Sequence, residues 1–266
     1  MNATAAVFQG VGRPFDIAIR PLHRPAGGEV LVEVVACTLC GSDLHSIHGR
    51  RSVPTPSVLG HEIIGRILDF GPDAGRLDAA GLTLASGDRV TWAIVASCGG
   101  CISCRRGLPQ KCERGFKYGH EPMSPGRELS GGLADHCLLV PGTAIFRVPD
   151  GLSDATACPA SCATATVAAA IEAAGPLEGR KVLVIGTGML GVTAAAWTRV
   201  LGASDVIACD PNEERLASAA EFGATRSASP SRLAEVVTQA TEGRGVDVAL
   251  DFSGSPDAIE AALPLI

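Results

Sequence analysis

The 266-residue sequence lacks three features that would assign it to other classes of protein. No uninterrupted apolar stretch is long enough to span a bilayer, and no charged segment followed by an apolar run opens the chain, so we expect neither a membrane span nor a signal peptide. Basic residues are not in excess. The net charge is −6 and the pI about 5.5, which argues against a general affinity for nucleic acid or anionic membranes. Charged residues make up only 19% against 46% hydrophobic ones, a balance typical of a folded chain with a sizeable core.

Cysteine, by contrast, is abundant, and its spacing is informative. Four of the ten cysteines fall in the run CGGCISCRRGLPQKC, with the spacing C-x2-C-x2-C-x7-C. Four cysteines this close together cannot all be core residues of one regular element, and four thiolates can close a tetrahedron around one Zn²⁺ with no open position. The sequence therefore predicts a structural zinc and a reducing, cytoplasmic location rather than a disulfide framework. The predicted ligands are Cys98, Cys101, Cys104 and Cys112.

The residue pattern changes near position 150. Before it, short β-like runs alternate with Gly and Pro, which predicts a β-rich, barrel-like domain over residues 1–154. After it, strands alternate with helices, which predicts βαβ crossovers and a parallel sheet over residues 155–266. The strands expected in the first part are 29–37, 61–71, 88–95, 133–141 and 144–151, with the cysteine loop 96–115 interrupting them. In the second part we expect helices at 154–174, 189–201, 212–222, 231–242 and from 256, and strands at 181–186, 205–210, 225–228 and 246–254.

A glycine-rich loop, G-T-G-M-L-G, directly follows the buried-type strand KVLVI and opens a helix. Gly186 permits the tight turn, Gly188 lets the backbone approach a pyrophosphate, and Gly191 lets the helix pack closely on the strand. The free N–H groups at the helix start, around Met189 and Leu190, favour an anion. The loop in this context predicts a dinucleotide-binding unit.

An acidic residue follows the second strand of this unit. Asp210 lies nineteen residues after Gly191, where a carboxylate can bind both ribose hydroxyls of NAD and repel the 2′-phosphate of NADP. Arg215, one helical turn further on, can flank the adenine ribose. Because Arg215 can also partly tolerate a phosphate, NADP stays open as the alternative to NAD.

A second set of zinc-type ligands is dispersed along the chain. Cys40, His61 and Cys162 offer two thiolates and an imidazole, a set that binds zinc while leaving a position for water or an alcohol. Zinc in such a site is a Lewis acid that favours ionisation of the alcohol and hydride transfer to a nicotinamide. Glu62, next to His61, is an alternative ligand in the absence of substrate, or a charge just outside the ligand set.

Three polar residues of the segment CGSDLH complete this set. Asp43 is placed to orient His61 by accepting from its free ring N–H. Ser42 and His45 make a proton path from the bound alcohol through the ribose and the imidazole to water. A lone cysteine or histidine is usually structural, but the combination with a nucleotide loop favours the catalytic interpretation.

Together these motifs resemble the zinc-dependent medium-chain alcohol dehydrogenases from the first strand to the last residue. GHE at 60–62 and CGSDLH at 40–45 match the family's metal and relay segments, and GDRV at 87–90 and GGLADH at 131–136 match family strands. The third catalytic ligand of that family lies some two dozen residues before the glycine loop, which favours Cys162, 24 residues before Gly186, over Cys158. The resemblance implies a GroES-like catalytic domain followed by a Rossmann domain, two zinc ions per chain, NAD, and a small alcohol or aldehyde substrate.

Three phrases resemble more narrowly a branch associated with phosphonate catabolism. They are GLPQKCERGFKYGHE (107–121), LSGGLADHCLLVPGTAI (129–145) and PASCATATVAAAI (159–171). This resemblance implies an alcohol or aldehyde bearing an anionic phosphonate, or a breakdown product of one. An anionic tail needs a cation or a backbone nest near the zinc, although each nearby cation taken singly also fits a solvated surface charge. The candidates are Arg50, Arg51, Lys117, His120 and Arg127.

The sequence departs from the family in length. A complete dinucleotide fold has about six strands, whereas we expect four here before Ile266, so the Rossmann domain is expected to be incomplete and the full-length form to be a homo-oligomer. By family analogy, Gly254 and Ser255 lie near the nicotinamide ribose. Two alternatives to the phosphonate-related enzyme stay open: a polyol or amino-alcohol dehydrogenase of the same family, and a non-catalytic zinc-binding fragment. A zinc-free quinone-type reductase is disfavoured by the four-cysteine run.

Overall fold

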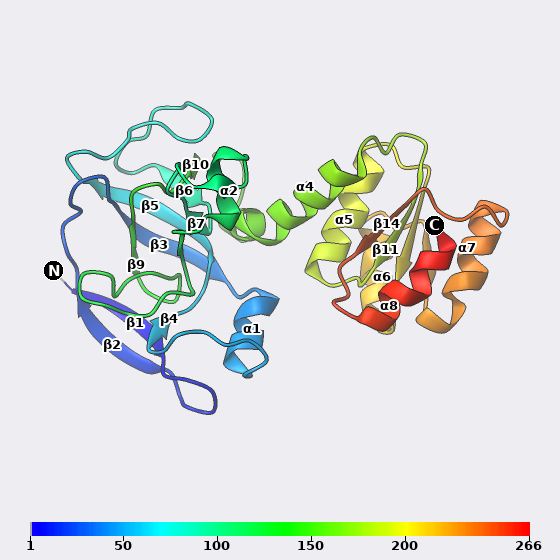
Figure 1. Ribbon diagram of the computed structural model, residues 1–266, viewed down its shortest axis with the longest axis horizontal. Coiled ribbons are helices and arrows are strands. Elements are labelled where there is room, and N and C mark those ends of the chain that lie inside the picture. Colours follow the sequence, from blue (N-terminus) through cyan, green and yellow to red (C-terminus); the bar gives the residue numbers. More distant parts are fainter. Residues whose placement is uncertain (1) are drawn as a thin grey trace. The chain divides into compact units, whose positions relative to one another are not determined.

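The computed structural model describes residues 2–266, which divide into two compact units with the boundary after Cys162 (Figure 1). The sequence pattern puts the boundary at residue 154, eight residues earlier. The difference arises because α3 (Asp154–Ala157) and the short 3-10 helix η2 (Cys158–Ser161) belong to the first unit. Ala157 and Cys158 are fully buried against Ile64 and Val148, so these two turns complete the core of the first unit.

The first unit is β-rich, as the sequence predicts. A five-stranded antiparallel sheet has the order β10 (Ile145–Arg147), β6 (Arg89–Trp92), β5 (Glu62–Phe70), β3 (Val30–Thr38) and β9 (His136–Leu139). A three-stranded sheet has the order β2 (Asp16–Pro21), β1 (Asn2–Phe8) and β4 (Ser57–Val58), and β7 (Val95–Ala96) pairs with β8 (Phe116–Lys117). The pattern analysis did not predict β1 and β2. Two of the residues that β1 buries, Ala3 and Ala5, are small, which weakens the strand signal, although Val7 and Phe8 at its end are buried as well.

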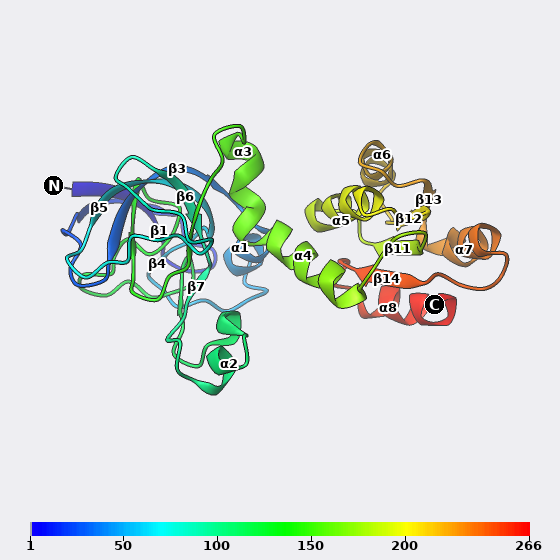
Figure 2. The same cartoon turned by 90° about the horizontal axis from the view of Figure 1, so that it is seen from above.

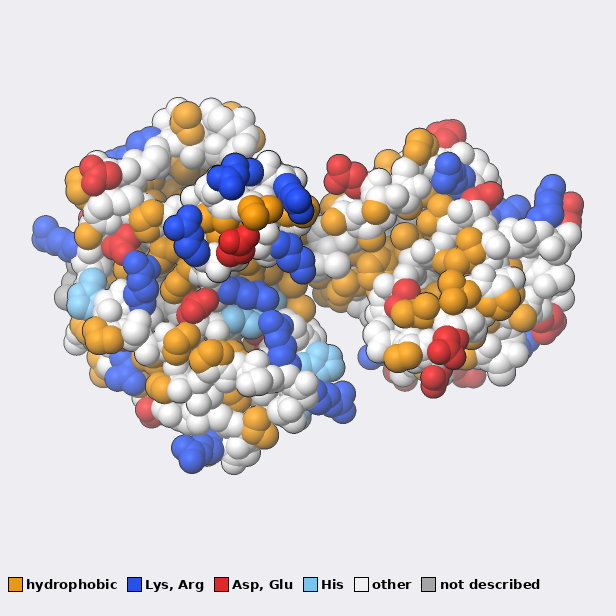
Figure 3. Space-filling model, viewed as in Figure 1, with side chains coloured by type: hydrophobic (Ala, Val, Ile, Leu, Met, Phe, Trp, Pro, Cys, Tyr) orange, Lys and Arg blue, Asp and Glu red, His pale blue; other side chains and the backbone are white. Residues whose placement is uncertain are grey.

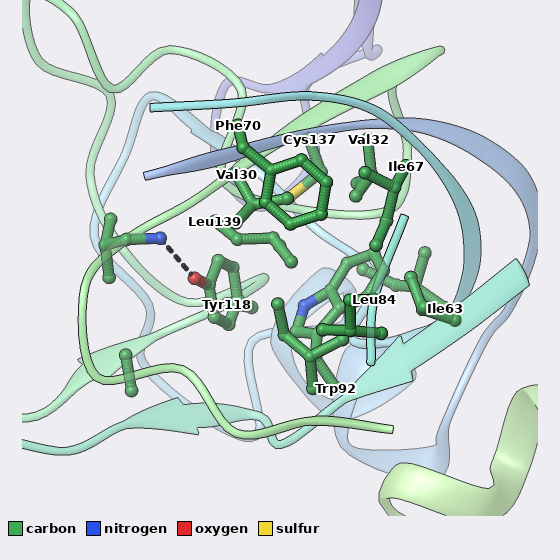
Figure 4. Packing of buried hydrophobic residues seen from close by; sticks show 14 residues of the cluster. Val30, Val32, Ile63, Ile67, Phe70, Leu84, Trp92, Tyr118, Cys137 and Leu139 are labelled. Atoms are coloured by element: carbon green, nitrogen blue, oxygen red, sulfur yellow. Dashed lines mark hydrogen bonds between the residues drawn. The ribbon is translucent and has the colours of Figure 1, made fainter. Parts of the chain in front are cut away.

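The core of the first unit holds the segment that follows the cysteine loop. Tyr118 is fully buried among aliphatic side chains, with the Trp92 ring edge-on at 6.1 Å (Figure 4). A buried phenol needs a hydrogen-bond partner. Its oxygen accepts the Val140 N–H at 2.7 Å and lies 2.6 Å from the Thr143 hydroxyl. Tyr118 therefore fixes the position of its neighbours in the chain, Lys117 and His120.

The second unit is a parallel sheet covered by helices on both faces. The strand order is β13 (Arg226–Ala228), β12 (Asp205–Cys209), β11 (Lys181–Ile185) and β14 (Val248–Asp251). One face packs against α4 (Ala163–Ala174) and α5 (Met189–Val200), with α6 (Glu213–Glu221) beside α5, and the other against α7 (Leu233–Thr241) and α8 (Pro256–Ala262) (Figure 2). The central strands are accordingly buried on both faces, which explains their continuous apolar sequences.

The long helix expected over 154–174 is broken. Pro159 lacks an N–H, and Cys162 leaves the helical region at φ −125° and ψ −80°, so the helix is interrupted at Cys162. Within residues 2–266 no single helix is long and apolar enough to cross a membrane, and this bent pair passes that test by length and composition only. The remaining helical turns are α1 (Gly41–Ile47), α2 (Ile102–Arg105), η1 (Pro109–Lys111), η3 (Pro230–Arg232) and η4 (Leu263–Leu265).

Candidate active site, structural metal lobe and nucleotide cavity

The fold of the first unit brings the three dispersed ligand candidates together. One ligand atom each from Cys40, His61 and Cys162 lies within 4.8 Å of the others, and the two sulfurs are 3.7 Å apart. The residues come from the N-cap of α1, the residue before β5 and the end of η2, so only the folded chain assembles them. Two thiols and an imidazole at this spacing fit a zinc ion.

The buried carboxylate of Asp43 holds two of the three ligand candidates in place by hydrogen bonds. It is 1% exposed, and its Oδ1 accepts from His61 Nδ1 at 3.1 Å and from the Gly60 N–H at 3.3 Å. Its Oδ2 accepts the Cys40 N–H at 3.0 Å. Because the proton of the imidazole is held on Nδ1, Nε2 is free to act as a ligand. One carboxylate thus positions two of the three ligand candidates.

The ligand atoms strongly perturb one another. The neighbouring Cys162 thiol and the His61 ring bond to the sulfur of Cys40 and lower the pKa of Cys40 to about 3, while the pKa of Cys162 is raised by the adjacent sulfur and by burial. Burial lowers the pKa of His61, but its hydrogen bonds to Asp43 and Cys40 outweigh this and raise it to about 9. A divalent cation would relieve this conflict, because it allows both sulfurs to be ionised at once.

The other predicted members of the site lie around this group. Ser42 Oγ is 3.3 Å from His61 Nε2, at the edge of the ligand cluster. His45 lies three residues further along α1 and is exposed. Among the described residues the ligand cluster consists of Cys40, His61 and Cys162 and does not include Glu62. The buried carboxylate of Glu62 instead accepts a hydrogen bond from Thr38 Oγ1 at 2.7 Å, and its negative charge raises the pKa of Cys162. This arrangement favours the interpretation of Glu62 as a charge outside the ligand set.

The four-cysteine run folds into a separate lobe. The ligand atoms of all four cysteines lie within 4.8 Å of one another. Backbone groups point at the sulfurs: Cys98 N–H donates to Cys112 Sγ at 3.2 Å, and Cys104 N–H to Cys101 Sγ at 3.5 Å. A hydrogen bond from the Gly100 backbone, with another from Arg114, lowers the pKa of Cys98 to about 6. Sequence reasoning did not single out Arg114, whose only signal is its place two residues after the last cysteine.

The glycine loop of the second unit has no room for side chains. A Cβ on Gly191 would lie 1.9 Å from the Gly186 carbonyl oxygen, and one on Gly186, at φ +80°, would lie 2.6 Å from the Ser253 nitrogen. These contacts hold the start of α5 tightly against the end of β11. A cavity of about 370 Å³ opens there, lined among others by Gly186, Gly188 and Ser255. Its position after the carboxyl ends of the parallel strands is where such folds bind nucleotides.

Asp210 lies in the wall of this cavity and is 3% exposed. Its Oδ2 accepts the Thr187 N–H at 2.8 Å and its Oδ1 the Asn212 N–H at 2.9 Å, so the carboxylate is held rigidly. Arg215 also lines the cavity, with Nη1 3.9 Å from Asp210 Oδ2 and a side chain that is 61% exposed. Of the two residues at the helix start, Met189 is 59% exposed and Leu190 packs into the core.

The sequence and the fold match known proteins. Residues 26–150 match the alcohol dehydrogenase GroES-like domain and residues 189–266 the zinc-binding dehydrogenase domain. The chain is 31% identical to an L-threonine 3-dehydrogenase of Pyrococcus horikoshii over 252 residues, which is 91% of this chain and 67% of that protein. An alcohol dehydrogenase of Thermotoga maritima has a TM-score of 0.93 at 28% identity, covering 100% of this chain and 75% of that one. A benzyl alcohol dehydrogenase of Acinetobacter calcoaceticus has a TM-score of 0.87 at 29% identity, covering 100% and 74%.

The chain belongs to the zinc-binding medium-chain alcohol dehydrogenase family. The GroES-like and Rossmann folds predicted for the two parts are confirmed. The family assignment also makes the chain a zinc-dependent oxidoreductase of the alcohol dehydrogenase class, with zinc and NAD(H) as its expected cofactors.

Proposed function

We propose that this enzyme interconverts an alcohol and its aldehyde, that the substrate carries a phosphonate or a similar anion, and that the reaction takes place at the Cys40–His61–Cys162 group. The observation that carries the proposal is the convergence of these three ligand candidates from three segments onto one position, with Asp43 fixed behind them. Hydride would pass to or from NAD held by the second unit.

Each residue of the site has a distinct role in this proposal. A bound zinc would supply Lewis acidity, which makes the substrate hydroxyl easier to ionise. Asp43 keeps the Nδ1 proton of His61 in place, and the three ligand candidates would hold the metal. Ser42 Oγ, next to His61 Nε2, would take the hydroxyl proton, and the exposed His45 would pass it to solvent.

The remaining parts of the proposal rest on other observations. The four-cysteine lobe would hold a second zinc. Asp210 and Arg215 would contact the adenosine ribose, with the glycine loop under the pyrophosphate. All ten cysteines are free, which supports a cytoplasmic location, and a homo-oligomeric full-length form is part of the same proposal.

An amino-alcohol substrate is the second candidate. The observation that favours it is the 31% identity to an L-threonine 3-dehydrogenase. The two candidates differ in charge, because an amino alcohol carries an ammonium group and a hydroxyalkylphosphonate only an anion. Rates with matched substrates of both kinds, and with a neutral polyol, would separate them.

The test is turnover and metal content measured on the same preparations. The zinc-loaded protein should reduce NAD with an alcohol substrate, while Cys40→Ala and His61→Ala should lose this activity and one of the two zinc ions. Cys37→Ala removes a thiol three residues from Cys40 and should retain both zinc ions and turnover. Two zinc ions with no turnover and no change in NADH fluorescence would favour the non-catalytic alternative and overturn the proposal.

A further inference from the structure

A tight turn over residues 117–120 lies directly against the candidate active site. The Lys117 carbonyl accepts the His120 N–H at 3.0 Å, and Gly119 between them has φ +72°. A Cβ at Gly119 would lie 2.6 Å from the Gly60 carbonyl oxygen and 3.2 Å from His61 Cβ. The backbone of the turn therefore lies in close contact with the segment that carries a ligand candidate.

The turn presents a histidine to the ligand group. The ring centroids of His120 and His61 are 4.9 Å apart. His120 Nδ1 lies 2.9 Å from the Tyr118 carbonyl, to which it donates, whereas its Nε2 is buried and has no hydrogen-bond partner within residues 2–266. A buried polar atom without a partner is uncommon in a folded protein. It is accounted for if a substrate group makes the missing hydrogen bond.

Two cations share this place. Lys117 begins the turn and is half-buried, and Arg51 is half-buried just after α1, where its N–H donates to the His45 carbonyl. Burial lowers the pKa of the Lys117 ammonium, and the charge of Arg51 lowers it further, whereas Cys162 acts in the opposite direction. The charges of Arg51 and Cys162 thus act on Lys117, which begins the turn that packs against Gly60 and His61.

Neither cation is neutralised by the described chain. Within residues 2–266 no carboxylate lies within 4.0 Å of a charged nitrogen of Arg51 or Lys117. The carboxylate closest to the turn in sequence, Glu121, instead accepts the Lys117 backbone N–H at 2.8 Å. Two half-buried like charges without a counter-ion are unfavourable, and a bound anion would compensate for them.

Arg51 and Lys117 also differ from the other candidate cations in their surroundings. Arg127 lies 3.7 Å from Glu29 and over the Phe116 ring, so its charge has a partner. Arg50 is exposed. In the view of Figure 3, the first unit shows many Lys and Arg side chains with fewer acidic ones between them, although the chain as a whole has a net charge of −6.

We propose that Arg51 and Lys117 form an anion-binding subsite beside the Cys40–His61–Cys162 group, with His120 Nε2 as an additional polar contact. The subsite takes the phosphonate, phosphate or carboxylate group of a small hydroxylated substrate. Two cations on one anion give charge-assisted hydrogen bonds, which are among the stronger polar interactions in proteins. The inference rests on the proposed function, because it places the anion on a substrate of that reaction.

The test is binding of 2-hydroxyethylphosphonate to the zinc-loaded protein, measured by calorimetry without turnover. Lys117→Met and Arg51→Met should each weaken binding by about 10- to 100-fold, the usual effect of losing one charge-assisted contact. The matched control, Arg50→Met, removes the same charge one residue away and should leave binding within about twofold of the wild-type value. Lys117→Arg should restore most of the affinity if charge is what matters. Zinc content verifies that every variant retains its fold and metal.

The possible outcomes separate the two proposals. The subsite would be overturned if the wild-type protein did not bind the phosphonate, or if Arg50→Met weakened binding as much as Lys117→Met and Arg51→Met. It would also be overturned if the affinity did not change on replacement of Lys117 and Arg51, since the anion would then contact only the metal. If Lys117→Met loses zinc or fails to fold, Arg51→Met, which lies outside the turn, decides the question. Binding that depends on both cations without any NAD reduction would leave the subsite standing and overturn the proposed reaction.

Discussion

Replacement of Asp43 by asparagine probes how one buried carboxylate supports the candidate catalytic metal site. Asp43 accepts three hydrogen bonds: from His61 Nδ1 and the Gly60 N–H on one oxygen, and from the Cys40 N–H on the other. Asn has almost the same shape but offers only one accepting oxygen. If that oxygen faces His61, its NH₂ group faces the Cys40 N–H, and two donors oppose each other in a buried place.

The size of the effect follows from this conflict. A buried donor that loses its acceptor costs about 1–3 kcal/mol. Loss of the carboxylate behind a histidine ligand typically weakens metal binding by about 10- to 100-fold, which corresponds to about 1.4–2.7 kcal/mol. The two estimates agree, so we expect Asp43→Asn to weaken binding of the catalytic zinc by about 10- to 100-fold. The zinc of the four-cysteine lobe should be unaffected, because its ligands lie elsewhere.

The measurement is a titration with a competing chelator, followed by zinc analysis of the protein. The wild-type protein should lose its two zinc ions in separate steps. In Asp43→Asn, only the step in which the catalytic zinc is lost should move to lower chelator concentration. Asp150→Asn, which changes an exposed carboxylate of the same unit, is the matched control. An Asp43→Asn protein that retains both zinc ions as tightly as the control would refute the reasoning.

Three further perturbations test other parts of the structure. Asp210→Asn should weaken NADH binding about tenfold and reduce the preference of the protein for NADH over NADPH, because Asp210 lines the cavity and its carboxylate is held by two backbone N–H groups. Fluorescence titrations that show an unchanged preference for NADH would contradict this role of Asp210. Tyr118→Phe should cost about 1–3 kcal/mol of unfolding free energy, because the Val140 N–H loses its buried acceptor; a loss below about 0.5 kcal/mol in urea denaturation would show that water replaces the phenol. Asp205 has a lowered pKa because its hydrogen bonds to Arg226 and Thr225 outweigh its burial. It therefore contributes stability at neutral pH that is lost as the pH falls from about 4 through its folded pKa, so Asp205→Asn should be destabilising at pH 7 and the difference should disappear in strong acid. A difference in unfolding free energy between the wild-type protein and Asp205→Asn that stays constant with pH would rule out this account.

Local sequence determined the parts of the protein whose residues are close neighbours in the chain. The four-cysteine lobe needs ligands only from residues 98–112, so their spacing sufficed to predict the cluster. The glycine loop is similarly local: the strand, the turn and the helix start are consecutive, and the close approach at Gly191 follows from the motif. The alternation of strands and helices in the second unit also depends on local periodicity. From residue 181 onward the structure has its strands and helices where the pattern predicts them, within a few residues, whereas the helix expected over 154–174 is broken.

Other features were decided by tertiary contacts. The break at Cys162 interrupts a helix that composition alone would continue, and the sulfur of Cys162 lies beside that of Cys40. The position of Glu62 depends on a hydrogen bond to Thr38, on the neighbouring strand, which no spacing rule predicts. Strand β1 was not predicted, since two of its buried residues, Ala3 and Ala5, are small, and its pairing with β2 shows that it is a strand.

The sequence by itself determined the class of the protein, the four-cysteine cluster and the glycine loop, because each of these depends on residues at short, fixed separations. Only the tertiary structure decided which charges face the candidate active site. Five candidate residues were equivalent in the sequence. The fold distinguished them by pairing Arg127 with Glu29, exposing Arg50, leaving Arg51 and Lys117 without a carboxylate within 4.0 Å among residues 2–266, and burying His120 beside His61. The physical reason is that a counter-ion is a neighbour in space, and the chain segments that supply or withhold it are far apart in sequence.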